Sequence, residues 1–248
     1  MIFKYLLKSL LISGFLLSWN DSVSSASETG LESLLKSRES IVSIHALIDE
    51  TIQPTQQPML DSKTGRVVVA RRIRSAERQR SGAGVIIHPS GLIVTNIHII
   101  RSAKKIAVIL HDGTTHAAAV LNILGPEDLA LLKIDPPFPL KPIEFADSNE
   151  VHLGDDVVNI GHSQLLKETI SGGRIIGLGT SLLPGDTKES VEMIKINMSL
   201  YRGDSGGPVL DKDGRLIGII VAKQVSKEKA AFAIPSNKIK KLYLHTIK

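Results

Sequence analysis

The sequence predicts an all-β protein, because short apolar strands separated by turn signals recur through both of its halves. Two apolar segments flank the Pro-Ser-Gly turn at residues 89–91, and an Asp-Gly pair at 112–113 joins two further strands. The same strand and turn pattern returns after residue 150. At 248 residues and 42% hydrophobic content, the chain is long enough for one large domain or for two smaller units that share a cleft.

The first 26 residues are typical of a targeting segment. Lys4 and Lys8 precede an apolar stretch at residues 9–19, and small residues follow as far as Ala26. This order is that of a secretory signal peptide cleaved after Ala26, and an uncleaved membrane anchor is the alternative. Both interpretations export residues 27–248, to the periplasm or to the exterior. Because the chain has no cysteine, packing alone must hold this exported part together.

A serine between glycines is the strongest candidate for a nucleophile. It lies in the segment Arg202-Gly203-Asp204-Ser205-Gly206-Gly207-Pro208. Gly203 allows backbone dihedrals that a side chain forbids, so the amides of Gly203 and Ser205 can point into one small space. Two such donors are what an oxyanion hole requires. The alternative is a Gly-rich turn whose serine bonds only to its own backbone.

A serine nucleophile needs a base, and the base needs an acid that orients it. His98 is the candidate base, because it comes where the second apolar segment after the Pro-Ser-Gly turn ends. Asp128 is the candidate acid, because it stands immediately before the apolar run at residues 129–134. A carboxylate buried there would stay ionised only with His98 and backbone donors as partners.

Together these segments resemble the chymotrypsin-fold, trypsin-like serine proteases of the HtrA (Deg) type. The resemblance covers residues 41–240 and rests on several motifs in that family's order, namely residues 82–100, 112–113, 128–134, 153–161, 203–210, 214–218 and 232–236. It implies two antiparallel six-stranded β-barrels with a catalytic cleft between them, and a short C-terminal helix. The barrels would span residues 41–135 and 150–235 and the helix residues 236–247, with the Pro-rich segment 136–142 as the linker.

The same resemblance implies a serine endopeptidase of exported or misfolded proteins. His98 would be the general base, Asp128 its orienter and Ser205 the nucleophile, with the Gly203 and Ser205 amides as oxyanion donors. The chain departs from the family at Asp204, where Asn is common, and the sequence leaves the partner of Asp204 open. Residues 236–248 leave no room for the PDZ domain that many relatives append.

The position of residues in the resembling fold also implies a substrate pocket. The residue before the scissile bond would contact Ser199, Leu200, Val221, Ala222 and Lys223. Because no carboxylate falls at the base of this pocket, small or medium aliphatic side chains are favoured over Arg or Lys. Lys223 at the rim could attract an acidic residue instead.

Residues 51–81 are expected to form an insertion. The Pro-interrupted stretch 53–58 predicts a loop, 61–65 a turn and 67–69 a short strand. Residues 61–80 carry a surplus of five positive charges, equal to the formal net charge of the whole chain. A solvated insertion, a loop for homo-oligomer contacts as in the family, and contact with an anionic surface are three open interpretations. The arginines concerned are Arg71, Arg72, Arg74, Arg78 and Arg80.

The sequence favours polypeptide partners and no cofactor. No aromatic residues are interleaved with the arginines, which leaves nucleic-acid bases no stacking platform. His111 and His116 flank a hairpin without the spacing of a zinc site, so no metal is expected. A second class of function stays open from the residues alone: a non-proteolytic, chaperone-like module that binds unfolded polypeptides with its triad idle.

Overall fold

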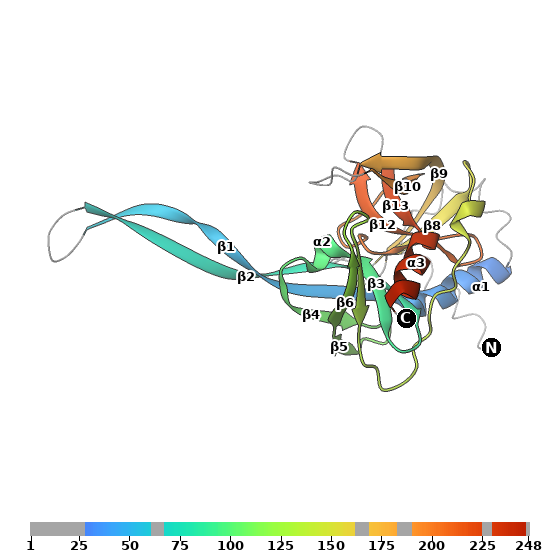
Figure 1. The fold of residues 1–248 in the computed structure, drawn as a ribbon, viewed down its shortest axis with the longest axis horizontal. Coiled ribbons are helices and arrows are strands. Elements are labelled where there is room, and N and C mark those ends of the chain that lie inside the picture. The colour runs from blue at the N-terminus through green and yellow to red at the C-terminus, as the bar shows by residue number, and fades with distance from the viewer. Residues whose placement is uncertain (1–27, 61–66, 162–168, 183–189, 225–229, 247–248) are drawn as a thin grey trace, which may run out of the picture.

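The computed structural model describes residues 28–60, 67–161, 169–182, 190–224 and 230–246 (Figure 1). It confirms the all-β class with a short C-terminal helix. The first sheet comprises β1 (Ile41–Leu60), β2 (Val67–His88), β3 (Leu92–Asn96), β4 (Ala103–Ile109), β5 (Thr115–Ala117), β6 (Ala119–Leu124) and β7 (Leu129–Lys133). The second comprises β8 (Asp156–Gly161), β9 (Thr169–Leu182), β10 (Ser190–Asn197), β11 (Pro208–Leu210), β12 (Leu216–Gln224) and β13 (Ala230–Pro235). The helices are α1 (Glu28–Ser37), α2 (Ile97–Ile100) and α3 (Ser236–Thr246), with short 3-10 turns η1 (Arg38–Ser40) and η2 (Ser148–Glu150).

The first sheet has seven strands in the order β5-β4-β1-β2-β3-β7-β6. Its two edge strands, β5 and β6, are consecutive in the chain and are joined through Ala118 alone. One bent segment therefore pairs with β4 by its first half and with β7 by its second half, so the sheet curls back on itself. Counted as one strand, β5 and β6 give the six strands that were expected.

The second unit is a closed barrel in the order β10-β13-β12-β11-β8-β9, completed by the pairing of β9 with β10. The alternation of side chains along its strands fits a sheet with one buried face. In β10, Val191 and Met193 are buried while Ser190 and Glu192 are exposed. This unit closes without an edge, and antiparallel neighbours meet the hydrogen-bonding needs of its strands.

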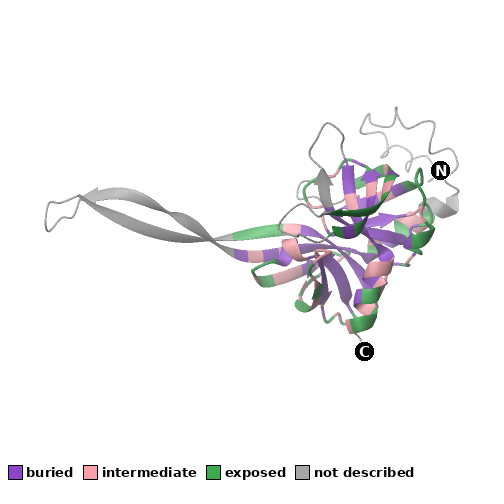
Figure 2. Ribbon diagram, turned by 45° about the horizontal axis from the view of Figure 1, so that its top comes forward, coloured by how far each residue is buried: buried purple, intermediate pink, exposed green. Residues whose placement is uncertain are grey.

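One apolar core joins the two units. It brings Val85 and Leu131 of the first sheet together with Leu210 and Ile219 of the second, and all four side chains are fully buried. Ile239 of α3 and the partly buried Leu34 of α1 pack against the same core. Figure 2 shows the buried residues gathered on the strands of the body. The two units are thus docked through shared packing rather than linked loosely.

The short strand expected at residues 67–69 is part of β2, and the turn expected at 61–65 lies outside the described residues. The expectation of a loop at residues 53–58 was wrong. Instead β1 and β2 form one long antiparallel ladder, from Ile41 paired with Val85 to Leu60 paired with Val67. Its outer part, which we call the arm (residues 49–60 and 67–77), projects away from the body in Figure 1. Proline is tolerated there because each strand of a two-stranded ribbon has an edge without a partner, and the register shifts between Ile52 and Thr55, next to Pro54.

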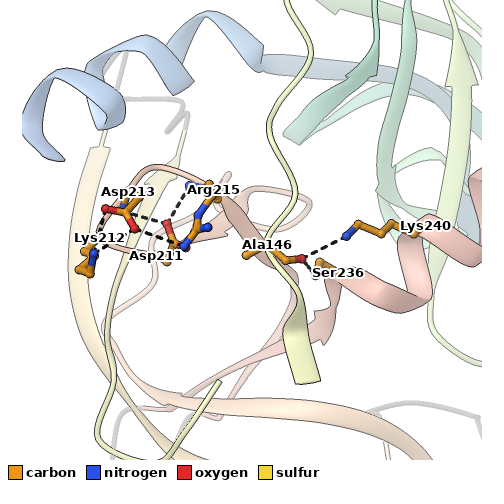
Figure 3. A network of polar contacts seen from close by, with 7 residues as sticks. All are labelled: Ala146, Asp211, Lys212, Asp213, Arg215, Ser236 and Lys240. Atoms are coloured by element: carbon orange, nitrogen blue, oxygen red, sulfur yellow. Dashed lines mark hydrogen bonds and ion pairs between the residues drawn. The ribbon is translucent and has the colours of Figure 1, made fainter. Parts of the chain in front are cut away.

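Charged side chains hold the turn between β11 and β12, which comes after the Ser205 loop in the chain. Asp211 Oδ1 accepts hydrogen bonds from the amides of Asp213 and Arg215, each at 2.9 Å, and its Oδ2 binds Arg215 Nε at 2.9 Å (Figure 3). The hydrogen bond and the charge of the Asp211 carboxylate raise the pKa of the Arg215 guanidinium. Together these bonds hold β11 against β12.

The segment that follows the linker is fastened to α3 at Ala146. The carbonyl oxygen of Ala146 accepts from Ser236 Oγ at 2.9 Å and from Lys240 Nζ at 3.4 Å (Figure 3). The amide of Ala146 donates to Leu216 O at 3.0 Å, which ties this segment to β12 as well.

Among the helices of the described ranges, none has the length and apolar character needed to cross a bilayer.

Candidate active site

His98 stands where a buried strand gives way to one turn of helix. All five residues of β3 are buried between β2 and β7, and α2 begins directly after Asn96. The amide of Ile97 donates to Asp128 O at 2.9 Å, which fixes the start of α2. Because Ile99 and Ile100 are buried, the helix leaves His98 on its open side, with 42% of the side chain exposed.

Asp128 is held in a left-handed backbone conformation, with φ of 55°. Its amide donates to Gly125 O at 3.1 Å, and its side chain is only 17% exposed. Oδ1 accepts from the backbone amide of His98 at 2.9 Å, and Oδ2 pairs with His98 Nδ1. Because the Asp128 carboxylate can only accept a hydrogen bond, the ring proton of His98 belongs on Nδ1, and Nε2 is left as an acceptor.

The Ser205 loop joins the two units. Ser205 O accepts from the amide of Ala83 in β2 at 2.8 Å, and the amide of Gly206 donates to Ile220 O in β12 at 2.9 Å. Positive φ angles at Gly203 (105°) and Gly206 (80°) allow the tight course of the loop. Throughout the described part of the chain, neither the Gly203 amide nor the Ser205 amide has a hydrogen-bond acceptor.

Asp204, whose partner the sequence left open, is fully buried. Its Oδ1 accepts from Thr169 Oγ1 at 3.1 Å, and its Oδ2 accepts from the amide of Tyr201 at 2.6 Å. The carboxylate packs so closely on Gly161 that a Cβ there would overlap Oδ1. Asp204 therefore anchors the loop that carries Gly203 and Ser205 to β8 and β9 of the second barrel.

A cavity of about 340 Å³ opens over these groups. Its lining comprises Gln79, Arg80, Ser81, His98, Ile99, Leu200, Tyr201, Arg202, Gly203 and Ser205. Ser205 and His98 thus come from different units and face one space. No hydrogen bond joins the Ser205 hydroxyl to the imidazole among the described residues.

The structure brings together the residues predicted as triad and oxyanion donors, whereas the predicted substrate pocket is only partly represented. Leu200 lines the cavity, but Ser199 and Val221 do not. Val221 is buried in the shared core, and Ser199 is exposed. The side chains of Ala222 and Lys223 lie outside the described residues.

Sequence reasoning missed the contribution of β2 to this cavity. None of the three interpretations of the basic segment places Arg80 at the catalytic cleft, yet Arg80 and Gln79 both line the cavity. Gln79 Nε2 contacts Nδ1 of His45, and burial lowers the pKa of His45. Arg80 reaches the cavity through the pairing of β1 with β2, which was not predicted from the sequence. This pairing places Arg80 opposite Ala46, at the base of the arm.

No group of three or more metal-ligating side chains occurs in the described ranges. The polar groups at the cavity include an imidazole with its carboxylate, the Ser205 hydroxyl and two unengaged amides. This set can deprotonate a hydroxyl and stabilise an oxyanion, which are the requirements of acyl transfer through a serine.

Comparison with known proteins gives a consistent picture. The family profile of the trypsin-like peptidase domain matches residues 82–219. A probable periplasmic serine endoprotease, DegP-like, of Rickettsia prowazekii (strain Madrid E) is 39% identical over 164 residues, which are 64% of this chain and 32% of that protein. The periplasmic pH-dependent serine endoprotease DegQ of Escherichia coli (strain K12) is 39% identical over 160 residues, covering 63% of this chain and 35% of DegQ.

A solved structure shares the fold. The HtrA-type protease AlgW with decapeptide superposes with a TM-score of 0.68 at 24% identity, over 88% of this chain and 67% of that chain. The chain spans about a third of the length of the curated relatives it matches.

Proposed function

The chain belongs to the family of trypsin-like peptidase domains and is homologous to the DegP and DegQ proteases of the HtrA type, and from this membership we propose that it is a serine endopeptidase. Ser205 is the nucleophile, His98 the general base and Asp128 the residue that orients the base. The amides of Gly203 and Ser205 form the oxyanion hole. The observation that carries this proposal is the double engagement of Asp128 by the amide and the ring of His98, in a cavity that Ser205 also lines.

The proposed reaction is acyl transfer. His98 Nε2 takes the proton of the Ser205 hydroxyl as its oxygen attacks a peptide carbonyl, and the Asp128 carboxylate stabilises the imidazolium. The two unengaged amides donate to the oxyanion of the tetrahedral intermediate. His98 then protonates the leaving amine, and water repeats the sequence on the acyl-enzyme.

We propose exported or misfolded polypeptides as substrates. The relatives are named periplasmic proteases, and residues 1–26 predict a signal peptide or an N-terminal anchor, a prediction that lies outside the described residues. For the pocket on the acyl side of the scissile bond, Leu200 supports a preference for aliphatic side chains. A peptide-library cleavage profile dominated by Arg or Lys would contradict this preference.

For the arm we propose contacts between copies of the chain, with binding of its arginines to an acidic surface as the alternative. The arm extends from the body, where a second copy can reach it (Figure 1). Deleting residues 61–80 separates the two: loss of binding to acidic vesicles supports the surface contact, and loss of self-association supports the contact between copies.

The experiment that tests the proposed catalysis is labelling of residues 27–248 with a fluorophosphonate, followed by mass mapping of the adduct. Ser205→Ala is the control variant. Labelling confined to Ser205 is expected, because a fluorophosphonate reacts with a serine that an adjacent base activates. Labelling at any other serine contradicts the assignment.

The missing bond between Ser205 and His98 favours one second candidate, a polypeptide-binding module with its triad at rest. In that case the folded protein would not be labelled, while Ser205→Ala and the natural protein would bind unfolded polypeptides with equal affinity. Hydrolysis of a peptide that depends on Ser205 would exclude this module as the main function.

A further inference from the structure

We propose that Arg80 binds a carboxylate of the substrate on the leaving-group side of the scissile bond, an inference that rests on the proposed peptidase function and deepens it. Arg80 lies at the base of the arm, in β2, and lines the cavity that contains His98 and Ser205. The carboxylate is either the side chain of an acidic residue or the free C-terminus of a peptide.

The guanidinium of Arg80 is fixed at one of its nitrogens. Nη1 donates to the carbonyl oxygens of His98 and Arg101, each at 3.2 Å. These two bonds use both hydrogens of Nη1 and tie the arginine to α2, which carries the candidate base. In the described part of the chain, Nε and Nη2 of Arg80 have no partner.

The free Nε and Nη2 groups form the fork that binds carboxylates side by side. This chain uses the same two nitrogens elsewhere: Nε and Nη2 of Arg174 both contact Oδ1 of Asp156 at 2.9 Å, and those of Arg215 both contact Oδ2 of Asp211 at 2.9 Å. Both of those pairs are complete within the chain. At Arg80 the matching carboxylate must come from outside the described residues.

The charge of the cavity favours such a ligand. Its lining holds two guanidiniums, Arg80 and Arg202, and no acidic side chain. Arg202 likewise has no ion-pair partner among the described residues. Two carboxylates lie nearby: Asp128 is engaged by His98, and Asp204 is fully buried and accepts from Thr169 and from the amide of Tyr201. An anionic group that enters the cavity therefore meets a positive field without a competing anion.

The chemistry of the base indicates on which side of the scissile bond Arg80 binds the substrate. The imidazole that takes the proton of Ser205 must pass it to the leaving amine, so the leaving peptide lies next to His98. Arg80 is bonded to the backbone of His98, whereas Leu200 belongs to the segment that leads into Ser205. On this ground Arg80 is assigned to the residues after the scissile bond and Leu200 to the acyl side.

The test measures binding, so that it does not depend on turnover. The Ser205→Ala protein is titrated with C-terminally amidated peptides in which a single Asp, or Asn as its neutral match, is moved along a neutral sequence. A further peptide has a free C-terminus and no acidic side chain. Cleavage sites in the same peptides are mapped with the active protein. The ratio of dissociation constants for Asn and Asp peptides reports the contribution of the carboxylate.

We expect Asp to improve binding by about three- to tenfold at low salt, only at positions after the cleavage site, and less at high salt. Arg80→Gln brings the ratio to one, and Arg80→Lys, which lacks the fork, retains part of it. Lys105→Gln, which removes the same charge from an exposed site outside the cavity, leaves the ratio unchanged. Loss of His98 positioning in Arg80→Gln would affect Asp and Asn peptides equally and leave their ratio unchanged.

A ratio near one in the protein with Arg80, a ratio that survives Arg80→Gln, or a benefit confined to positions before the cleavage site each overturns the proposal. If only the peptide with a free C-terminus gains affinity through Arg80, the carboxylate is the peptide terminus. Absence of cleavage together with an Arg80-dependent ratio would refute the peptidase function and leave the carboxylate site standing.

Discussion

Asp128 connects three parts of the site through one residue. Its carboxylate binds the amide and the ring of His98, its carbonyl oxygen accepts from Ile97 N, and its own amide closes a turn onto Gly125 O. The left-handed φ of 55° is costly for a residue with a side chain, and Asp and Asn bear that cost best. The identity of this residue is thus constrained by its backbone as well as by its charge.

This double constraint makes Asp128→Asn the informative variant. Asn keeps the left-handed backbone and an oxygen for the His98 amide, but it no longer holds the proton on Nδ1. We expect kcat to fall by about four orders of magnitude while the unfolding midpoint in urea changes little. Hydrolysis of a peptide substrate and urea unfolding measure the two effects. A kcat within about tenfold of the original value would remove Asp128 from the mechanism.

Gly206 is expected to tolerate no side chain. Its φ is 80°, and a Cβ there would overlap the Ala83 carbonyl oxygen and come within 2.7 Å of Thr95 Oγ1. Gly113→Ala is the matched control, because Gly113 has φ of 87° and a Cβ added there would meet nothing within 4 Å. We expect Gly113→Ala to lower the free energy of unfolding by about 1–2 kcal/mol, and Gly206→Ala by about 1–3 kcal/mol more.

Urea unfolding of both glycine variants measures this difference. Equal losses for Gly206→Ala and Gly113→Ala would mean that the loop moves away from Ala83 at no cost. Such a result would contradict the close packing of the Ser205 loop on β2 that the structure shows.

At the scale of single residues, the sequence predicts the roles of those residues that stand in short local motifs. His98 and Ser205 stand in short segments whose glycines and apolar flanks are visible without a structure. The surroundings of Asp204 are different, because Thr169 lies 35 residues away and meets it only after β8 and β9 have paired. Arg80 enters the cavity for a similar reason, through a long-range contact with α2.

At the scale of elements, local composition was a poor guide to the arm. Two prolines and a run of polar residues predict a loop, but both strands find a partner in each other, and a ribbon tolerates proline at its edges. The strands of the body were predictable because one face of each is apolar, as in β10.

The arm is expected to contribute little to the stability of the body. β1 pairs with β4 only as far as Ile48, so beyond this residue β1 and β2 support each other alone. An isolated two-stranded ribbon is marginally stable. Replacing residues 51–75 by Asn-Gly, which suits a two-residue turn between the paired Glu50 and Ala76, should shift the melting temperature by only a few degrees.

Differential scanning calorimetry measures this shift, and sedimentation of the same samples reports the assembly state. A large fall in melting temperature would show that the arm supports the body through contacts other than its own ladder. If the natural protein self-associates and the shortened variant sediments in the same way, the contacts between copies are not made by the arm.

At the scale of the whole molecule, the site exists only because two units share a core. His98 follows β3 of the first sheet and Ser205 precedes β11 of the second, and the backbone bond from Ala83 N to Ser205 O spans the junction. The side chains beneath it, such as Leu131 and Ile219, are fully buried in one cluster. Interiors packed to this degree transmit a local loss of contact to their neighbours.

The shared core predicts that the two units unfold together. Leu131→Ala removes a fully buried side chain from the first sheet and should lower the free energy of unfolding by about 2–5 kcal/mol. Hydrogen exchange followed by mass spectrometry at low denaturant concentration measures the free energy of opening in both units. This free energy should fall by the same amount in strands β7 and β12. Leu244→Ala, at a half-exposed position of α3, is the control and should change protection by less than about 0.5 kcal/mol. If β12 kept its protection while β7 lost it, the second barrel would be an independent folding unit, and the serine loop would be stable without the histidine and aspartate that the proposed mechanism requires.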